Sequence, residues 1–213
     1  EDEIGGRKHC GKKEMTIRAV FFDLGGVILR TEYQAPRQAL AERFSMDYAD
    51  IDKLVFRSAS AARASVGEIS EAEHWLNVAQ TLKLPASESE RLQKEFFAGD
   101  MIDREIVAFL RSIKSTHTTG LISNAWSDLR SYIVREKFDD AFHFMVISAE
   151  AGVAKPAEKI YRIALEQAQV QPNEAAFVDD VQENIDACEN LGMLGIRFTD
   201  SESTLKRLKI ILS

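Results

Sequence analysis

The chain has 213 residues, of which 45% are hydrophobic and 8% aromatic, enough to build one large domain or a core with a modest insertion. Its formal net charge of −7 argues against a non-specific nucleic-acid binder, because such proteins neutralise phosphates with clustered Lys and Arg. No run approaches the roughly 18 apolar residues that a membrane-spanning helix needs. We therefore expect neither a nucleic-acid partner nor a membrane partner.

Two features indicate the cellular setting and the start of the folded part. Cys10 and Cys188 are too few to staple a fold of this size, which favours reduced thiols and a cytoplasmic protein. Residues 1–14 are polar and contain no apolar segment of the kind found in signal peptides. We expect them to be a disordered extension ahead of a natural start at Met15.

Apolar runs that are partly β-branched alternate with helical patterns along residues 15–31 and 100–213. The runs predict buried strands: Ile17–Asp23, Thr118–Ser123, Phe144–Ser148, Ala175–Asp179 and a shorter Gly195–Phe198. Between them, apolar residues recur with helical spacing over Ile102–Ile113 and Lys159–Ala168. This alternation predicts an α/β fold, with a mainly parallel sheet covered by helices on both faces.

Residues 32–99 interrupt this alternation and show no strand pattern. They predict four helices, near Gln34–Phe44, Asp47–Ser60, Glu71–Leu82 and Glu88–Phe97. Ser70 and Glu73 have the spacing of a capping box at the start of the third helix. An insertion directly after the first strand would sit above the carboxyl edge of the sheet, where ligands bind in such folds. We expect an all-helical cap there.

Polar residues suited to phosphoryl transfer follow the predicted strands. Asp23 ends the first strand beside two glycines, and the later members of the set are Ser123-Asn124, Lys155-Pro156 and Asp179-Asp180. Taken alone, each of these residues could have a purely structural role, in a helix cap, a strand-to-helix turn or a solvated loop. Their order, each at the end of a predicted strand or in its loop, favours one joint site.

The chemistry of this set predicts a metal-dependent nucleophile. Carboxylates brought to about 4 Å from one another repel. Carboxylate oxygens suit Mg²⁺, which binds one or two of them together with substrate phosphate. We expect Asp23, Asp179 and Asp180 to bind the metal, with a backbone carbonyl at Gly25 in reach. Asp23 would attack phosphorus, Lys155 would add positive charge, and Ser123 and Asn124 would bind phosphate oxygens.

At these residues the chain resembles the haloacid dehalogenase superfamily, in the branch with a small helical cap, over about residues 16–200. Its motifs match Phe22–Ile28, Ile122–Asn124, Gly152–Pro156 with Tyr161, and Phe177–Asp180 with Asn184 and Gly192. The resemblance implies a Rossmann-like core, magnesium dependence and an aspartyl-phosphate intermediate on the protein. We expect the substrate to be a small phosphorylated metabolite. Within the superfamily the chain is more similar to the glucose-1-phosphatase and epoxide-hydrolase N-domain phosphatases than to the phosphoserine phosphatases. Asn184 would lie behind the metal ligands, and Trp126 could line the pocket entrance or pack under the cap.

One position departs from the family pattern. Phosphatases of this family usually carry a second Asp two residues after the nucleophile as general acid and base, and Gly25 stands there. Three interpretations stay open: a hydrolase restricted to substrates with good leaving groups or using a substitute acid, a degenerate protein that binds metal and ligand, and a dehalogenase. The last is disfavoured because the family's dehalogenases do not use magnesium, which leaves the repulsion between Asp179 and Asp180 unexplained.

Overall fold

The computed structural model describes residues 16–213, and a five-stranded parallel sheet in the order β5-β4-β1-β6-β7 forms its centre. Its strands are β1 (Ala19–Phe22), β4 (Thr118–Ser123), β5 (Phe144–Ile147), β6 (Ala175–Asp179) and β7 (Leu194–Arg197). The bounds of β4 and β6 are those predicted, while β1 and β5 are shorter and β7 is shifted by one residue. The predicted α/β fold is confirmed. The extension expected at residues 1–14 lies outside the described residues.

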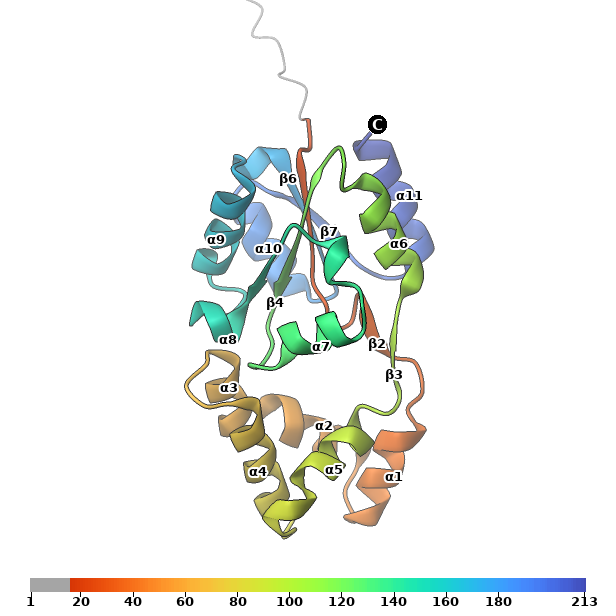
Figure 1. Ribbon diagram of the computed structural model, residues 1–213, viewed down its shortest axis with the longest axis vertical. Helices are drawn as coiled ribbons and strands as arrows, with labels where there is room; N and C mark the ends of the chain where they lie inside the picture. Colours follow the sequence, from red (N-terminus) through yellow and green to blue (C-terminus); the bar gives the residue numbers. More distant parts are fainter. Residues whose placement is uncertain (1–15) are drawn as a thin grey trace, which may run out of the picture.

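Helices cover both faces of the sheet (Figure 1). One face packs against α6 (Arg104–Ile113), α7 (Leu129–Arg135) and α11 (Ser201–Ile211). The other packs against α9 (Glu158–Ala168) and α10 (Gln182–Asn190). Successive residues of β1 alternate between the two cores, and all four are fully buried, which explains why its sequence is apolar throughout.

A short antiparallel pair, β2 (Leu29–Thr31) and β3 (Asp100–Ile102), carries the chain between the sheet and the cap (Figure 1). The sequence did not predict it, and the placement of Ile102 in a helix is wrong. That helix, α6, begins only after Asp103, whose carboxylate accepts hydrogen bonds from the amides of Glu105 and Ile106 at 3.0 Å each. The N-cap therefore separates strand from helix.

The cap consists of α1 (Ala35–Arg43), α2 (Tyr48–Arg57), α3 (Ala59–Ser65), α4 (Glu71–Thr81) and a 3₁₀ turn, η1 (Ala86–Glu88), followed by α5 (Ser89–Phe96). The single helix predicted over Asp47–Ser60 is wrong. Ser58 is extended, with ψ of 164°, and its hydroxyl accepts a hydrogen bond from the Ala61 amide, so it ends α2 and caps α3. The capping box of Ser70 and Glu73 is confirmed.

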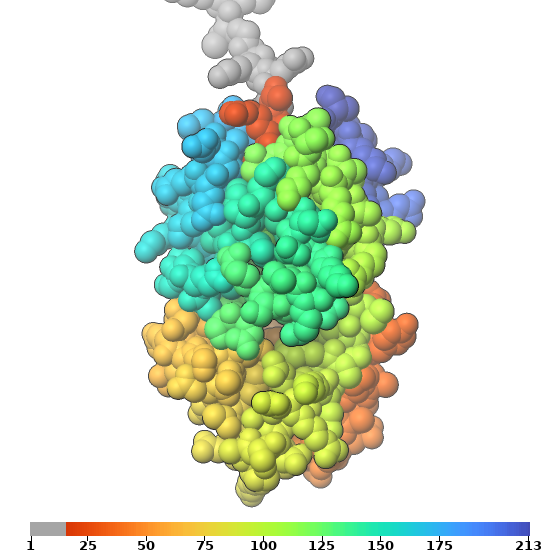
Figure 2. Space-filling view, in the orientation of Figure 1, coloured from red at the N-terminus to blue at the C-terminus, as the bar shows by residue number. Residues whose placement is uncertain are grey.

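An aromatic cluster joins the cap to the core, and the two parts pack directly against each other (Figure 2). Trp75 of α4 forms its centre, and Trp126 reaches into it from the loop after β4. Of the two placements left open for Trp126, the structure shows packing under the cap, where the side chain is 8% exposed. The cap thereby rests on the same loop that follows Ser123 and Asn124.

Candidate functional site

The candidate site lies at the carboxyl edge of the sheet, where the central strands β1, β4 and β6 end towards the cap (Figure 1). Asp23 directly follows β1, and its amide donates to the carbonyl of Val178 in the neighbouring strand β6 at 2.8 Å. Asp179 is the last residue of β6. Parallel pairing in register therefore brings two aspartates from distant parts of the sequence to adjacent positions.

Lys155 links these two aspartates. Its Nζ lies 2.8 Å from Asp23 Oδ1 and 2.7 Å from Asp179 Oδ2, and its side chain is only 1% exposed. The ammonium group also lies over the ring of Phe177, 5.3 Å from its centroid, where the aromatic face attracts a cation. A buried ammonium needs such partners, because an unpaired charge in this position would cost several kcal/mol.

Asp179 is held by further donors besides Lys155. The Val181 amide donates to its Oδ1 at 2.7 Å, and the Asn184 side-chain amide donates to both carboxylate oxygens at 3.1 and 3.0 Å. Asn184 is in turn fixed by its own carbonyl, which accepts a hydrogen bond from the hydroxyl of Tyr161 at 3.0 Å. Asn184 therefore holds the Asp179 carboxylate in position from the side of α10.

Three carboxylates meet at this point. One oxygen each of Asp23, Asp179 and Asp180 lies within 4.8 Å of the others. At that separation two unit charges repel by about 3–4 kcal/mol at an effective dielectric constant near 20. Burial, opposed by Lys155 and assisted by Asp179, raises the pKa of Asp23 to about 7. Burial and the charge of Asp179 also raise the pKa of Asp180. The protein alone does not balance the negative charge it has assembled here.

The two glycines that follow Asp23 differ in what their surroundings require. Gly26 has φ of +76°, and a Cβ on it would lie 2.3 Å from an Asp180 carboxylate oxygen, so only glycine lets Asp180 approach. Gly25 is exposed, and a Cβ there would meet no atom within 4 Å. The absence of a side chain at Gly25 is therefore not imposed by packing.

Ser123 and Asn124, the predicted phosphate-binding pair, occupy different environments. Ser123 ends β4 and is 2% exposed, and its hydroxyl has no hydrogen-bond partner within residues 16–213, so it is available to a ligand. Both ends of the Asn124 amide contact the backbone of Lys155: Nδ2 donates to the carbonyl at 2.9 Å, and Oδ1 accepts from the amide at 2.7 Å. The side chain of Asn124 thus orients Lys155, and the phosphate contact that we expect of this residue stays a prediction.

Sequence reasoning missed one supporting residue, Ser148. It is fully buried after β5, and its hydroxyl pairs with the amide and carbonyl of Ala125 at 3.0 and 3.2 Å. This contact fixes the loop that begins at Ser123. The signal in the sequence was a polar residue at the end of the predicted strand Phe144–Ser148, which we assigned to the strand and not to the site.

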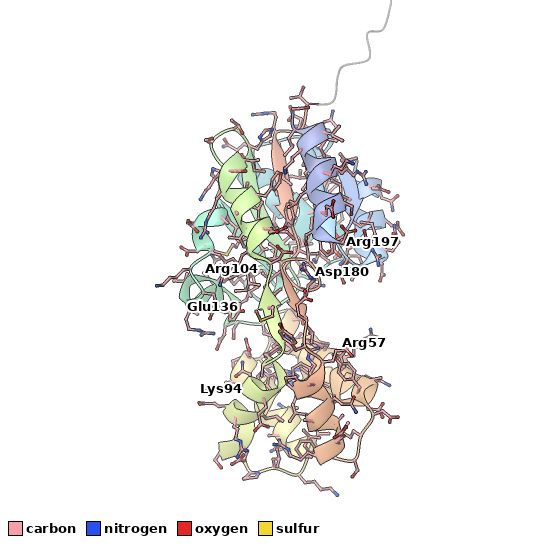
Figure 3. All side chains as sticks on the ribbon, turned by 90° about the vertical axis from the view of Figure 1, so that its right-hand side faces the viewer. Arg57, Lys94, Arg104, Glu136, Asp180 and Arg197 are labelled. Atoms are coloured by element: carbon pink, nitrogen blue, oxygen red, sulfur yellow. The ribbon has the colours of Figure 1, made fainter. Side chains whose placement is uncertain are left out.

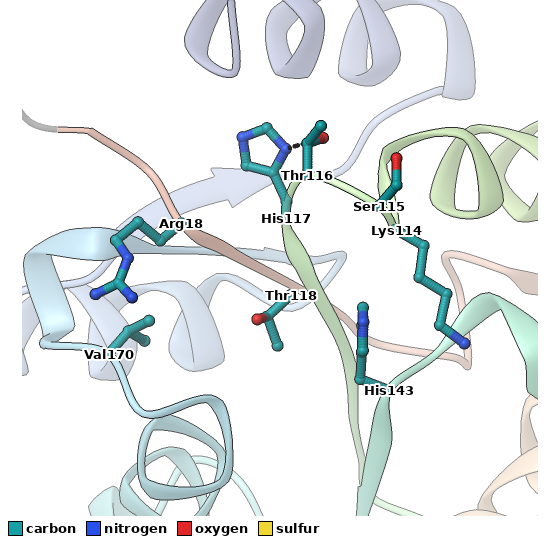
Figure 4. A pocket seen from close by; sticks show the side chains of 8 residues that line it. All are labelled: Arg18, Lys114, Ser115, Thr116, His117, Thr118, His143 and Val170. Carbon is teal, nitrogen blue, oxygen red and sulfur yellow. Dashed lines mark hydrogen bonds between the residues drawn. The ribbon is translucent and has the colours of Figure 1, made fainter.

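A polar cavity of about 280 Å³ lies elsewhere, at the amino ends of β1, β4 and β5 (Figure 4). Its cations already have partners: Arg18 pairs with Glu174, and Lys114 Nζ donates to the carbonyls of Asp140 and Phe142 at 2.6 and 2.8 Å. Because this cavity lies at the amino edge of the sheet and the aspartates lie at the carboxyl edge, we do not assign it to the candidate site.

The different demands on the two glycines can be tested directly. We expect Gly26→Ala to lower the free energy of unfolding by about 1–2 kcal/mol, because the added Cβ strains the left-handed backbone and displaces Asp180. Gly25→Ala is the matched control and should change it by less than about 0.5 kcal/mol. Chemical denaturation measures both, and equal effects at the two positions would contradict the assignment.

Comparisons with known proteins agree with this geometry. Residues 17–192 match the family model of the haloacid dehalogenase-like hydrolases. The chain is 25% identical over 215 residues to bifunctional epoxide hydrolase 2 of Sus scrofa, covering 92% of this chain and 39% of that protein's length. It is 24% identical over 196 residues to a sesquiterpene phosphatase of Aspergillus oryzae, covering 91% of this chain and 96% of the relative.

The fold is also found among solved structures. The chain is similar to a Bacteroides thetaiotaomicron enzyme of this family, solved with magnesium and inorganic phosphate, at a TM-score of 0.75 and 19% identity, covering 89% of this chain and 98% of that one. In the described residues, no helix is both long and apolar enough to cross a membrane. The matched family model covers most of the sequence and every residue of the aspartate and lysine cluster, so the chain belongs to the haloacid dehalogenase-like hydrolases.

Proposed function

We propose that the protein is a magnesium-dependent phosphatase that acts on a small phosphorylated metabolite through an aspartyl-phosphate intermediate on Asp23. The observation that carries the proposal is the clustering of Asp23, Asp179 and Asp180 within 4.8 Å around the buried Lys155. The names of relatives support the reaction class, since one is a sesquiterpene phosphatase. The solved relative that contains both magnesium and phosphate supports the choice of ligands.

The donor set fits Mg²⁺. Carboxylate oxygens are its preferred protein ligands, and three of them converge here, one from each aspartate, within 4.8 Å of one another. Asp23, Asp179 and Asp180 would hold the ion, together with the carbonyl of Gly25, whose exposed position leaves room for it. When bound, the ion would neutralise phosphate charge and offset the repulsion between the carboxylates.

The protein groups have separable roles in this proposal. Lys155 binds one oxygen of Asp23, which leaves the other oxygen to form a bond to phosphorus while the alkoxide leaves. The free hydroxyl of Ser123 donates to a phosphate oxygen. Water then attacks phosphorus, breaks the acyl phosphate bond and restores the Asp23 carboxylate, so each turnover converts one ester and one water into an alcohol and phosphate.

Gly25 narrows the range of substrates. A general acid contributes about 10²–10⁴-fold, which corresponds to roughly 3–5 kcal/mol of barrier at 1.36 kcal/mol per tenfold. Without an acid at Gly25, the leaving group must depart with little help from proton transfer. We propose that acyl, anomeric and aryl phosphates, whose leaving groups are stable anions, are hydrolysed better than alkyl phosphates.

We also propose that the protein is cytoplasmic.

A second candidate function is a degenerate hydrolase that binds metal and ligand with little turnover, and the observation in its favour is again Gly25. A dehalogenase is disfavoured by Asp180, because a halide leaves without metal and the site would gain nothing from a third carboxylate beside Asp23 and Asp179. Phosphate release across a panel of metabolites, measured with and without Mg²⁺, separates the candidates. If no phosphate is released but a ligand still raises the thermal stability of the protein, the degenerate binder is favoured.

The nucleophile assignment predicts the effect of Asp23→Asn. Removing the attacking oxygen should lower the release of nitrophenol from para-nitrophenyl phosphate by about 10³-fold or more. Asp139→Asn changes an exposed carboxylate far along the chain and serves as the control that keeps full activity. If the Asp23 variant retained wild-type turnover, another residue would be the nucleophile.

The missing acid predicts a gain of function. Gly25→Asp should raise kcat/KM for alkyl phosphates by up to about 10²–10⁴-fold, because the position has room for the side chain and the carboxyl can protonate the leaving alkoxide. Gly25→Asn has nearly the same shape without the acid and should give no gain. Equal kinetics for the two variants would mean that another proton donor already acts or that the new carboxyl is misplaced.

A further inference from the structure

One arginine of the cap differs from the others in its partners. Four of the arginines between residues 32 and 99 bind a carboxylate: Arg37 with Asp52 and Asp100, Arg43 with Glu95, Arg63 with Glu68, and Arg91 with Glu88 and Glu95. Arg57 is exposed and has no hydrogen-bond or ion-pair partner in the described part of the chain. Its guanidinium group is therefore free to bind an anion from outside the protein.

Arg57 lies where the cap meets the core. It is the last residue of α2, and the ring of the preceding Phe56 stacks on Trp126 with centroids 6.0 Å apart. Trp126 is only three residues beyond Ser123 of the candidate site. In Figure 3, Arg57 is at the upper edge of the cap, on the side of the molecule that carries Asp180, whereas Lys94 lies on the opposite side.

The negative charge of the site makes a free cation such as Arg57 important for any substrate that carries a second anionic group. Asp23, Asp179 and Asp180 against Lys155 leave a formal charge of about −2, which a divalent cation only cancels. The phosphate then adds about −1.5 to −2. A leaving group with its own negative charge would be repelled unless another cation faced it, and a guanidinium binds carboxylates and phosphates through paired hydrogen bonds.

Resting on the proposed function, we propose that Arg57 binds a second anionic group, a carboxylate or another phosphate, on the leaving-group part of the substrate. Arg57 would then determine specificity by selecting phosphate esters or acyl phosphates whose leaving group is itself an anion. The position of Arg57 at the end of α2 also suits the helix dipole, which explains why an arginine without an acidic partner is tolerated there.

Two aryl phosphates that differ in one charge test this role. The first is 4-carboxyphenyl phosphate, and the second is its methyl ester, in which the carboxylate is neutral. The wild type should prefer the carboxylate in kcat/KM. Arg57→Ala should lower that preference about tenfold, mainly through a higher KM, while hydrolysis of the methyl ester stays within about twofold. Arg57→Lys should retain part of the preference, because the charge remains.

Lys94→Ala provides the matched control, because Lys94 is an exposed cap cation on the other side in Figure 3 and should leave the preference unchanged. Thermal denaturation of each variant checks folding, which the exposed and unpartnered Arg57 should not affect. Raising the salt concentration should weaken the preference in the wild type and have little effect in Arg57→Ala.

The outcomes separate this inference from the proposed function. An unchanged preference in Arg57→Ala, or an equal loss on both substrates, would overturn the role of Arg57 while leaving the phosphatase intact. If the wild type hydrolysed neither aryl phosphate with Mg²⁺ present, the proposed function would fail, and the role of Arg57 with it.

Discussion

The contact of the Lys155 ammonium with Asp23 and Asp179 is the interaction on which the site depends. Because burying an unpaired charge costs several kcal/mol, the lysine and the aspartates stabilise one another, and neither side is tolerated without the other. The balance is incomplete, since burial still raises the pKa of Asp23 to about 7 and a third carboxylate, Asp180, lies within 4.8 Å. This excess of negative charge supports the proposal that the site binds a cation.

The rest of the fold keeps this cluster in place. Parallel pairing of β1 and β6 sets Asp23 beside Asp179, the Asn124 amide clamps the backbone of Lys155, and Asn184 holds Asp179 from behind. The cap contacts the same region, because Trp126, in the loop after β4, packs into the aromatic cluster of the cap. One loop therefore connects the cap to the edge of the sheet where we propose that the chemistry takes place.

The sequence predicted the parts that follow from local pattern. The bounds of β4 and β6 were right because both strands are largely buried runs of small, β-branched and apolar residues that end at a polar residue. The pair β2 and β3 was missed, since three residues carry no periodicity, and the break between α2 and α3 depends on how one hydroxyl, that of Ser58, is used. The role of Asn124 could not be read from sequence, because its partner is the backbone of a residue 31 positions away.

Titration calorimetry with Mg²⁺ tests the central claim most directly. If the three carboxylates form one incomplete charge cluster, the wild type should bind one ion per chain, and Asp180→Asn should weaken that binding at least about tenfold, because one charged ligand is lost. Absence of Mg²⁺ binding by the wild type, or equal affinity in the variant, would contradict the account.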